Sequence, residues 1–168
     1  MGELLGNKDG FFAIDKKKFY QACDLGMNAA VSYLVICNGS DKSNSKSSWS
    51  VNAIEKYTKI SRSRAKEAVD KLIAEGIIIQ IKGGTKPRYQ VMNASKGKLN
   101  PKEVIWLSNG IVQSVIGELP ALERIRQTQD VMILRLFVDL YLEQNLVDDG
   151  GIARYVYRTK YGRTPLGE

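Results

Sequence analysis

The side chains best suited to chemistry are cations that gather in one quarter of the chain. Residues 51–92 carry nine basic and four acidic groups, whereas residues 1–50 and 93–168 each have a net charge of only +1. A local excess of Lys and Arg favours a polyanionic partner, because neutralising phosphates releases condensed counterions. A solvated basic face without any partner is the alternative, and charge alone leaves the two interpretations equal.

The cations fall into two groups that follow one another in the sequence. The first group lies at a turn and the start of a helix: Lys59, Ser61, Arg62, Ser63, Arg64 and Lys66. The second group surrounds a pair of glycines: Lys82, Gly83, Gly84, Thr85, Lys86 and Arg88. Arginine offers two parallel donors to guanine or phosphate, and glycine lets the backbone approach a phosphate or a minor groove closely. We therefore predict that both groups contact DNA.

Other chemistries are disfavoured by the composition, since the chain has no histidine and only two cysteines, Cys23 and Cys37. A structural zinc site needs about four nitrogen or sulfur ligands. Without histidine the usual neutral-pH base is absent, as are Ser–His and Cys–His nucleophile pairs. No glycine-rich phosphate loop occurs. We expect no enzyme, no catalytic residue, no metal or other cofactor and no small-molecule ligand, and we expect both thiols to be free and buried.

The helices that precede the cations are predicted from capping residues and apolar spacing. Asp15 can cap a short helix that ends near Cys23. Gly26 breaks this helix, and apolar residues at helical spacing predict a second helix over residues 27–37. Residues 38–48 are polar and predict a flexible loop.

The cations themselves are predicted to lie on two helices and a hairpin. Ser50 can cap the first helix, Ile60 lies in the turn, and Gly76 ends the second helix. The β-branched residues that follow Gly76 predict a strand, which returns after the glycine turn. These elements span residues 51–57, 61–75, 77–81 and 88–92.

This segment, about 42 residues from Ser50 to Val91, resembles the winged-helix domains of the GntR-type superfamily. Three motifs carry the resemblance: Ile60-Ser61-Arg62, Lys66-Glu67-Ala68 and Glu75-Gly76-Ile77. The resemblance implies that Arg62, Ser63, Arg64 and Lys66 open a recognition helix that contacts bases and phosphates. It also implies that the wing contacts the flanking backbone or minor groove through Gly83, Gly84, Thr85, Lys86 and Arg88.

The sequence departs from this family at two places. Lys59 stands where the family turn often has glycine, so it either strains the backbone or adds a phosphate contact. Glu67 and Asp70 place negative charge on the outer face of the second helix, so we expect DNA contact to be concentrated in its first two turns.

The C-terminal third predicts further helices. A strand begins near Glu103, Pro120 starts a short helix, and Asp130 can cap a helix that runs to about Asn145. That last helix is apolar nearly all round and must be buried, either in its own domain or in a homodimer. Residues 154–163 interleave Arg and Lys with Tyr, which suits nucleic acid or a second winged-helix-like unit.

The sequence therefore predicts a mainly α fold of the α+β type, namely a winged helix-turn-helix with a small β-hairpin wing. We expect residues 1–95 to form this DNA-binding domain and residues 96–168 to form a helical domain. The second domain either dimerises or is an incomplete second winged-helix unit. The ending from Arg163 to Glu168 lacks the pattern of a finished domain, so we expect a longer protein.

The function expected from the sequence is specific binding of double-stranded DNA. The leading use is origin recognition by the N-terminal part of a replication initiator from a mobile element. One alternative is a dimeric transcription regulator on an operator, and another is a winged-helix module that binds only proteins. The apolar runs are shorter than the roughly 20 residues of a membrane span, and no signal peptide is evident. We expect a cytoplasmic homodimer.

Overall fold

An apolar helix, α2 (Met27–Asn38), forms the centre of the computed structural model, which describes residues 10–92, 100–114 and 118–143. Every residue of α2 except Asn28 is buried. Gly26 precedes it with φ +104°, a backbone conformation that favours glycine. Before this glycine lies α1 (Lys16–Asp24), whose cap residue Asp15 accepts a hydrogen bond from the Lys18 amide at 2.9 Å. Both helices confirm the prediction.

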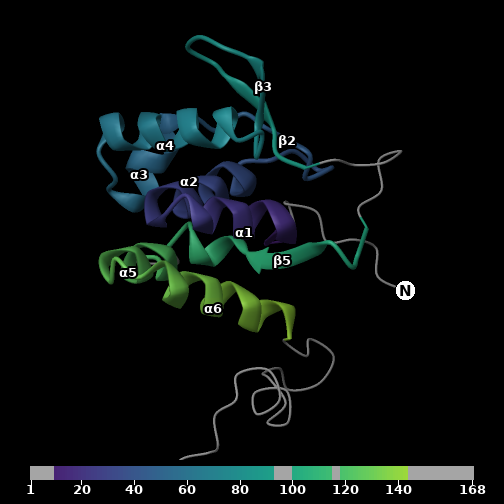
Figure 1. Cartoon of the computed structure of the whole chain (residues 1–168), viewed down its shortest axis with the longest axis vertical. Helices are drawn as coiled ribbons and strands as arrows, with labels where there is room; N and C mark the ends of the chain where they lie inside the picture. The colour runs from purple at the N-terminus through teal and green to yellow at the C-terminus, as the bar shows by residue number, and fades with distance from the viewer. Residues whose placement is uncertain (1–9, 93–99, 115–117, 144–168) are drawn as a thin grey trace, which may run out of the picture.

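The remaining helices cover two sides of α2 (Figure 1). On one side α2 packs against α3 (Val51–Thr58) and α4 (Arg62–Ala74). On the other side lie α5 (Ala121–Gln127) and α6 (Val131–Leu142), which pack against each other. Asp130 caps α6 through a hydrogen bond from the Met132 amide at 2.9 Å, as its sequence predicts.

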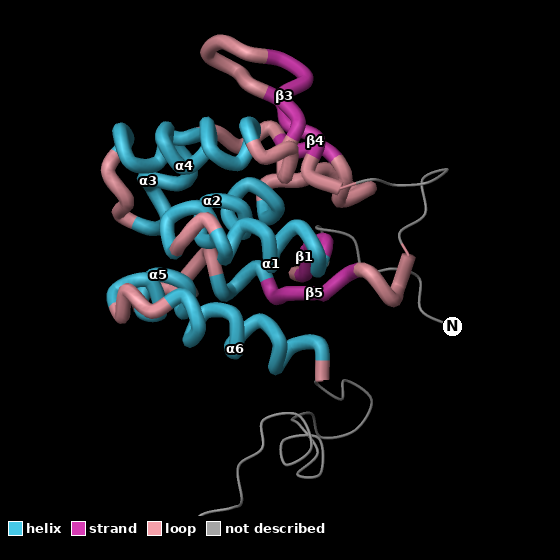
Figure 2. Tube along the Cα trace, viewed as in Figure 1, coloured by secondary structure: helices cyan, strands magenta, loops and turns pink. Residues whose placement is uncertain are grey.

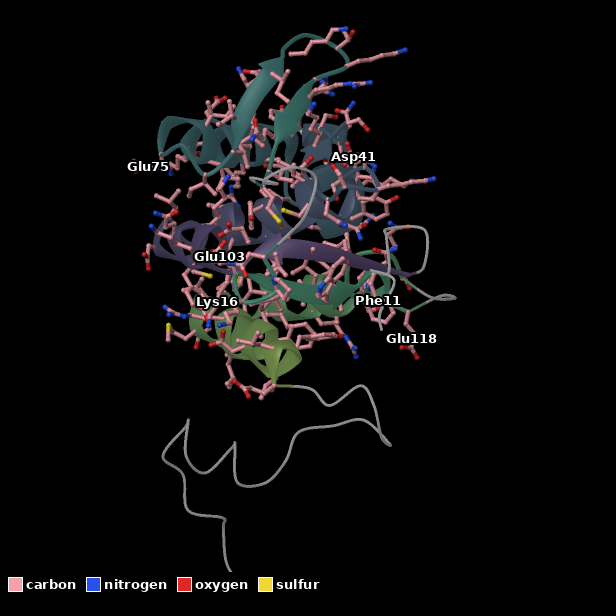
Figure 3. All side chains as sticks on the ribbon, turned by 90° about the vertical axis from the view of Figure 1, so that its right-hand side faces the viewer. Phe11, Lys16, Asp41, Glu75, Glu103 and Glu118 are labelled. Atoms are coloured by element: carbon pink, nitrogen blue, oxygen red, sulfur yellow. The ribbon has the colours of Figure 1, made fainter. Side chains whose placement is uncertain are left out.

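Two small antiparallel sheets complete the described structure (Figure 2). One sheet pairs β1 (Phe11–Asp15) with β5 (Val104–Ser108), which is followed by the short helix η2 (Asn109–Ile111). At its end the Lys16 amide donates to the Glu103 carbonyl at 2.9 Å, and both residues are labelled in Figure 3. The other sheet has the order β2-β4-β3, from β2 (Lys46–Ser47), β4 (Arg88–Gln90) and β3 (Ile79–Lys82).

The β1–β5 sheet joins the beginning of the chain to its C-terminal third. Residues from both segments contribute to one hydrophobic core, including Phe12 and Ile14 from β1 with Leu107 from β5 and Leu134 from α6. The predicted domain boundary at residue 95 lies outside the described residues. Strand β1 is absent from the sequence predictions, because its partner follows it by about 90 residues.

The polar segment 38–48, predicted as a flexible loop, is instead held at several points. Asn38 is the last residue of α2, and Lys46–Ser47 form strand β2 against β4. Asn44 is buried, and its side-chain oxygen accepts a hydrogen bond from the Ala13 amide at 3.1 Å. These polar side chains satisfy backbone groups of neighbouring elements, which composition alone does not reveal.

Helix α6 is less buried than its apolar sequence predicts. Leu134 and Val138 are fully buried, but Met132 is 62% exposed, Ile133 43% and Leu136 40%. The helix is tied to α1 by the Tyr20 hydroxyl, which donates to Asp139 Oδ1 at 2.5 Å. The expected end of this helix at Asn145 lies outside the described residues, as does the basic and aromatic segment 154–163.

A tryptophan fixes the chain before α3. The indole of Trp49 stacks on the Tyr57 ring, with 4.9 Å between ring centroids and 14° between planes. The indole also lies directly over Gly39, where an added Cβ would come within 1.9 Å of Trp49 Cγ. Gly39 is therefore required by close contact, and it lets Trp49 anchor the start of α3.

The described structure is of the α+β class, with helices and two small antiparallel sheets. Across residues 10–92, 100–114 and 118–143, the longest apolar helices are too short to cross a membrane.

Candidate nucleic-acid interface

The turn between α3 and α4 is held by backbone geometry and by one hydroxyl. Lys59 ends α3 in the left-handed conformation, with φ +57° and ψ 13°. The Thr58 hydroxyl donates to the Ile54 carbonyl at 2.6 Å and accepts from the Ile60 amide at 3.3 Å. Ile60 is buried in the core. Position 59 thus has the conformation that glycine adopts most easily, and the sequence places a lysine there.

Helix α4 ends as the sequence predicts, and this ending sets the direction of the hairpin. Gly76 has φ +67°, its amide donates to the Ile73 carbonyl at 3.0 Å, and the Ile77 amide donates to the Leu72 carbonyl at 2.9 Å. This pair of hydrogen bonds is the Schellman motif. Ile77 and Ile78 are buried immediately after it, so strand β3 begins two residues later than predicted, at Ile79.

The hairpin projects from the helices, and side chains with terminal nitrogens extend from it (Figure 3). Strands β3 and β4 pair antiparallel with a register shift between Gln80 and Lys82. At the tip, Gly84 has φ +87° and needs the freedom of glycine. Lys82 and Lys86 are exposed, whereas Pro87 is buried at the base of the turn. The predicted glycine turn is confirmed.

A cleft of about 250 Å³ lies between α4, the start of α3 and the hairpin. Its polar lining comes from all three elements: Ser50, Asn52, Arg62, Lys66, Asp70, Gln80, Gly84 and Thr85. Its apolar lining comes from Val51, Val69, Ile73, Pro87 and Tyr89. The cleft therefore brings together two predicted cations of α4 and two predicted residues of the hairpin tip.

On its other flank, α4 lies beside different residues. Arg64 lies beside Glu67 and Lys71 and borders a small hollow with the α1–α2 turn, not the hairpin cleft. Lys71 Nζ lies 2.8 Å from Glu67 Oε1, and the hydrogen bond from Lys71 lowers the pKa of the Glu67 carboxyl. The charge on this flank is partly neutralised within the helix.

The predicted DNA-binding residues therefore occupy several places. The cleft contains Arg62 and Lys66 of α4, together with Gly84 and Thr85 of the hairpin. Arg64 lies on the far flank. Arg88 borders a third hollow, with Gly39, Asp41 and Lys46. The others are exposed at the turn, the helix start or the hairpin: Lys59, Ser61, Ser63, Lys82, Gly83 and Lys86.

The cleft also contains polar residues that sequence reasoning did not assign to the site, namely Ser50, Asn52, Gln80 and Asp70. Ser50 caps α3 through the Asn52 amide at 3.3 Å, and this cap was predicted without its place in the cleft. Gln80 alternates with the exposed Ile79 and Ile81, so strand alternation could have indicated that it faces away from them.

Asp70 is the one acidic residue in the lining of this cleft. It is exposed, and no described residue donates a hydrogen bond to its carboxylate or forms a salt bridge with it. Burial raises the pKa of the Tyr89 hydroxyl, and the negative charge of Asp70 raises it further. The cleft is thus cationic where Arg62 and Lys66 line it and anionic one helical turn beyond Lys66.

The two thiols lie away from this cleft. Cys23 and Cys37 are free and buried, and burial raises the pKa of each to about 12. Neither thiol is therefore ionised near neutral pH. In the part of the chain that the structure describes, His, Cys, Asp and Glu side chains do not gather in a group that could hold a metal.

Comparison with protein-family models, with curated proteins and with solved structures finds no significant match for this chain.

Proposed function

We propose that this chain binds double-stranded DNA as a winged helix, with α4 in the major groove and the β3–β4 hairpin as the wing against the flanking backbone. The single observation that carries the proposal is the shared cleft, which Arg62 and Lys66 of α4 line together with Gly84 and Thr85 of the hairpin. An α-helix with side chains is about 10–12 Å in diameter, and the major groove is about 12 Å wide.

Electrostatics support the same proposal. The segment from Val51 to Met92 carries nine of the 25 basic residues of the chain and only four of its 18 acidic residues. In the described segments, the only acidic partner that forms a salt bridge with a cation of this segment is Glu67, which engages Lys71. Arg62 and Lys66 therefore remain available for phosphates or for guanine, which accepts hydrogen bonds at O6 and N7.

The biological use of DNA binding is a separate proposal. Origin recognition by a replication initiator of a mobile element is the use we favour, and operator binding by a dimeric transcription regulator is the alternative. Footprinting separates them, because initiation requires protection of repeated sequences at an origin, whereas regulation requires protection at a promoter. The expected homodimer also stays a prediction. A strict monomer of 18.8 kDa in light scattering at micromolar concentration would contradict it.

DNA binding is tested first by fluorescence anisotropy with labelled random-sequence duplex across a salt series. We expect a steep linear fall of log affinity with log salt, at about 0.9 per phosphate neutralised. The double variant Arg62→Ala/Lys66→Ala should lose at least about tenfold in affinity and lower the slope by about 0.9 for each of the two side chains that contacts a phosphate.

A matched control is Lys17→Ala/Lys102→Ala, which removes the same charge at a hollow formed by α1 and the approach to β5. It should bind almost as tightly as the wild type if the cleft is the binding site. Equal losses in both double variants would mean that general charge, rather than this cleft, determines affinity. Absence of binding at low salt would favour the module that contacts only proteins.

A further inference from the structure

We propose that Asp70 is a specificity-determining residue that selects cytosine in the bound duplex, an inference that rests on the proposed DNA binding. Asp70 lies beyond the first two turns of α4, where the sequence predicted most DNA contact, but it lines the same cleft one helical turn after Lys66 and is exposed. Its carboxylate has neither a hydrogen-bond donor nor a salt-bridge partner among the described residues.

The charge of Asp70 determines which part of DNA it can approach. An ionised carboxylate only accepts hydrogen bonds, and a phosphate offers no donor and repels it. The DNA backbone is therefore held near Arg62 and the hairpin tip and excluded from the surroundings of Asp70. A base that presents an amino group in the major groove is the one part of the duplex that complements this position.

The choice between the two amino-bearing bases follows from their edges. Adenine presents the N6 amino group beside the N7 acceptor, which suits an amide side chain that both donates and accepts. Cytosine presents its N4 amino group in the major groove, and it pairs well with a carboxylate, which needs only donors. The carboxylate of Asp70 therefore favours cytosine over adenine.

Lys66 extends this preference along the same face of α4. Its ammonium group donates only and suits guanine O6 and N7. Lys66 and Asp70 are one helical turn apart, about 6 Å along the helix, and residues at this spacing on a helix in the major groove contact neighbouring bases. We therefore expect the preferred site to contain a guanine and a cytosine at neighbouring positions.

Glu67 provides a matched control on the same helix. It is exposed like Asp70, but its carboxylate already engages Lys71 at 2.8 Å, and it lines the hollow on the opposite flank rather than the cleft. Asp70→Asn and Glu67→Gln each remove one negative charge. Glu67→Gln should strengthen binding to random duplex by less than Asp70→Asn, because Glu67 lies outside the cleft. Only Asp70→Asn should also change the base preference.

The experiment is selection from a random duplex pool by the wild type, Asp70→Asn, Asp70→Ala and Glu67→Gln, each checked for folding by circular dichroism. We expect the wild type to prefer cytosine about tenfold at one position, within the range for a good base contact. Asp70→Asn should shift that position toward adenine, Asp70→Ala should lose the preference, and Glu67→Gln should keep cytosine.

A second measurement uses the DNA instead of the protein. Replacing the selected cytosine by 2-pyrimidinone, which lacks the amino group, should weaken wild-type binding about tenfold and leave Asp70→Ala unchanged. Selection of the same base by all four proteins would overturn the role of Asp70, and so would binding without any sequence preference. In both of those cases DNA binding itself stands, whereas absence of wild-type binding to any duplex refutes the proposed function.

Discussion

The two flanks of α4 each carry two cations and one carboxylate, but in a different order and with different neighbours. On the flank toward the hairpin, Arg62 and Lys66 line an open cleft with Asp70. On the flank toward the α1–α2 turn, Arg64 lies beside the Glu67–Lys71 salt bridge. The difference shows that a basic helix does not bind equally with all its faces. The neighbouring residues and elements determine which of its cations stay available to a ligand.

The largest expected effect is on stability, and it comes from a core residue that holds α4, and thus both of its flanks, against the rest of the protein. Leu72 is a fully buried residue of α4, and Leu72→Ala should lower the free energy of unfolding by about 2–5 kcal/mol, because it leaves a cavity. Urea denaturation followed by circular dichroism measures the loss. An unchanged unfolding midpoint would show that α4 is not held against α2 as described, and the comparison of flanks would lose its basis.

A smaller effect, on affinity for DNA, should distinguish the two flanks of α4 directly. Arg62→Ala should weaken duplex binding by up to about tenfold, because it removes a contact to the DNA backbone. Arg64→Ala should weaken it by clearly less, because Arg64 lies outside the cleft. Anisotropy titrations at one salt concentration compare the two variants, which remove the same side chain. A greater loss for Arg64→Ala would reverse the assignment of the binding flank.

The turn that precedes both flanks offers a third test. Lys59 has φ +57°, and a left-handed conformation costs a residue other than glycine or asparagine about 1 kcal/mol. Lys59→Gly should therefore raise the free energy of unfolding by up to about 1 kcal/mol and raise the melting temperature. Lys56→Gly, inside α3, is the control and should lower stability by a similar amount. Destabilisation by Lys59→Gly would imply that the lysine side chain contributes more than its backbone strain removes.

The smallest effect concerns the salt bridge on the far flank. The hydrogen bond from Lys71 lowers the pKa of Glu67 in the folded state, so the stabilisation is present above the pKa of the unfolded chain. It is lost as pH falls through the lower, folded value. Glu67→Gln should abolish this small contribution, which the wild type has at neutral pH and loses as pH falls, while Asp70→Asn should leave it in place. Thermal melts of both variants between pH 3 and 7 make the comparison.

Local features of this fold follow well from sequence. The caps Asp15, Ser50 and Asp130, together with the helix end at Gly76, depend on residues within a few positions, and each was predicted at the correct place. The left-handed turn residue Lys59 was also indicated by its position. These signals are local because capping satisfies backbone groups of the same turn.

Features that depend on distant segments did not follow from sequence. Strand β1 needs β5, and the burial of Asn44 needs the Ala13 amide, so neither pattern is complete within its own segment. In the candidate site, the sequence indicated which residues are cationic but not that Arg64 and Arg88 lie apart from Arg62 and Lys66. For Arg64 the separation follows from helix periodicity, because residues two apart on a helix lie on different faces, so the sequence could have indicated it. The position of Arg88 depends on the tertiary packing of the hairpin.

The position of Trp49 has a spectroscopic consequence. The chain has two tryptophans, Trp49 before α3 and Trp106 in β5. Since Trp49 stacks on Tyr57 of α3 and directly precedes Ser50, which lines the cleft, a Trp106→Phe variant would emit only from the indole before α3. Trp49→Phe would emit only from Trp106 in the β1–β5 sheet. The protein therefore has two intrinsic fluorophores, one before α3 and one in β5. Each can be followed separately during unfolding and during titration with DNA.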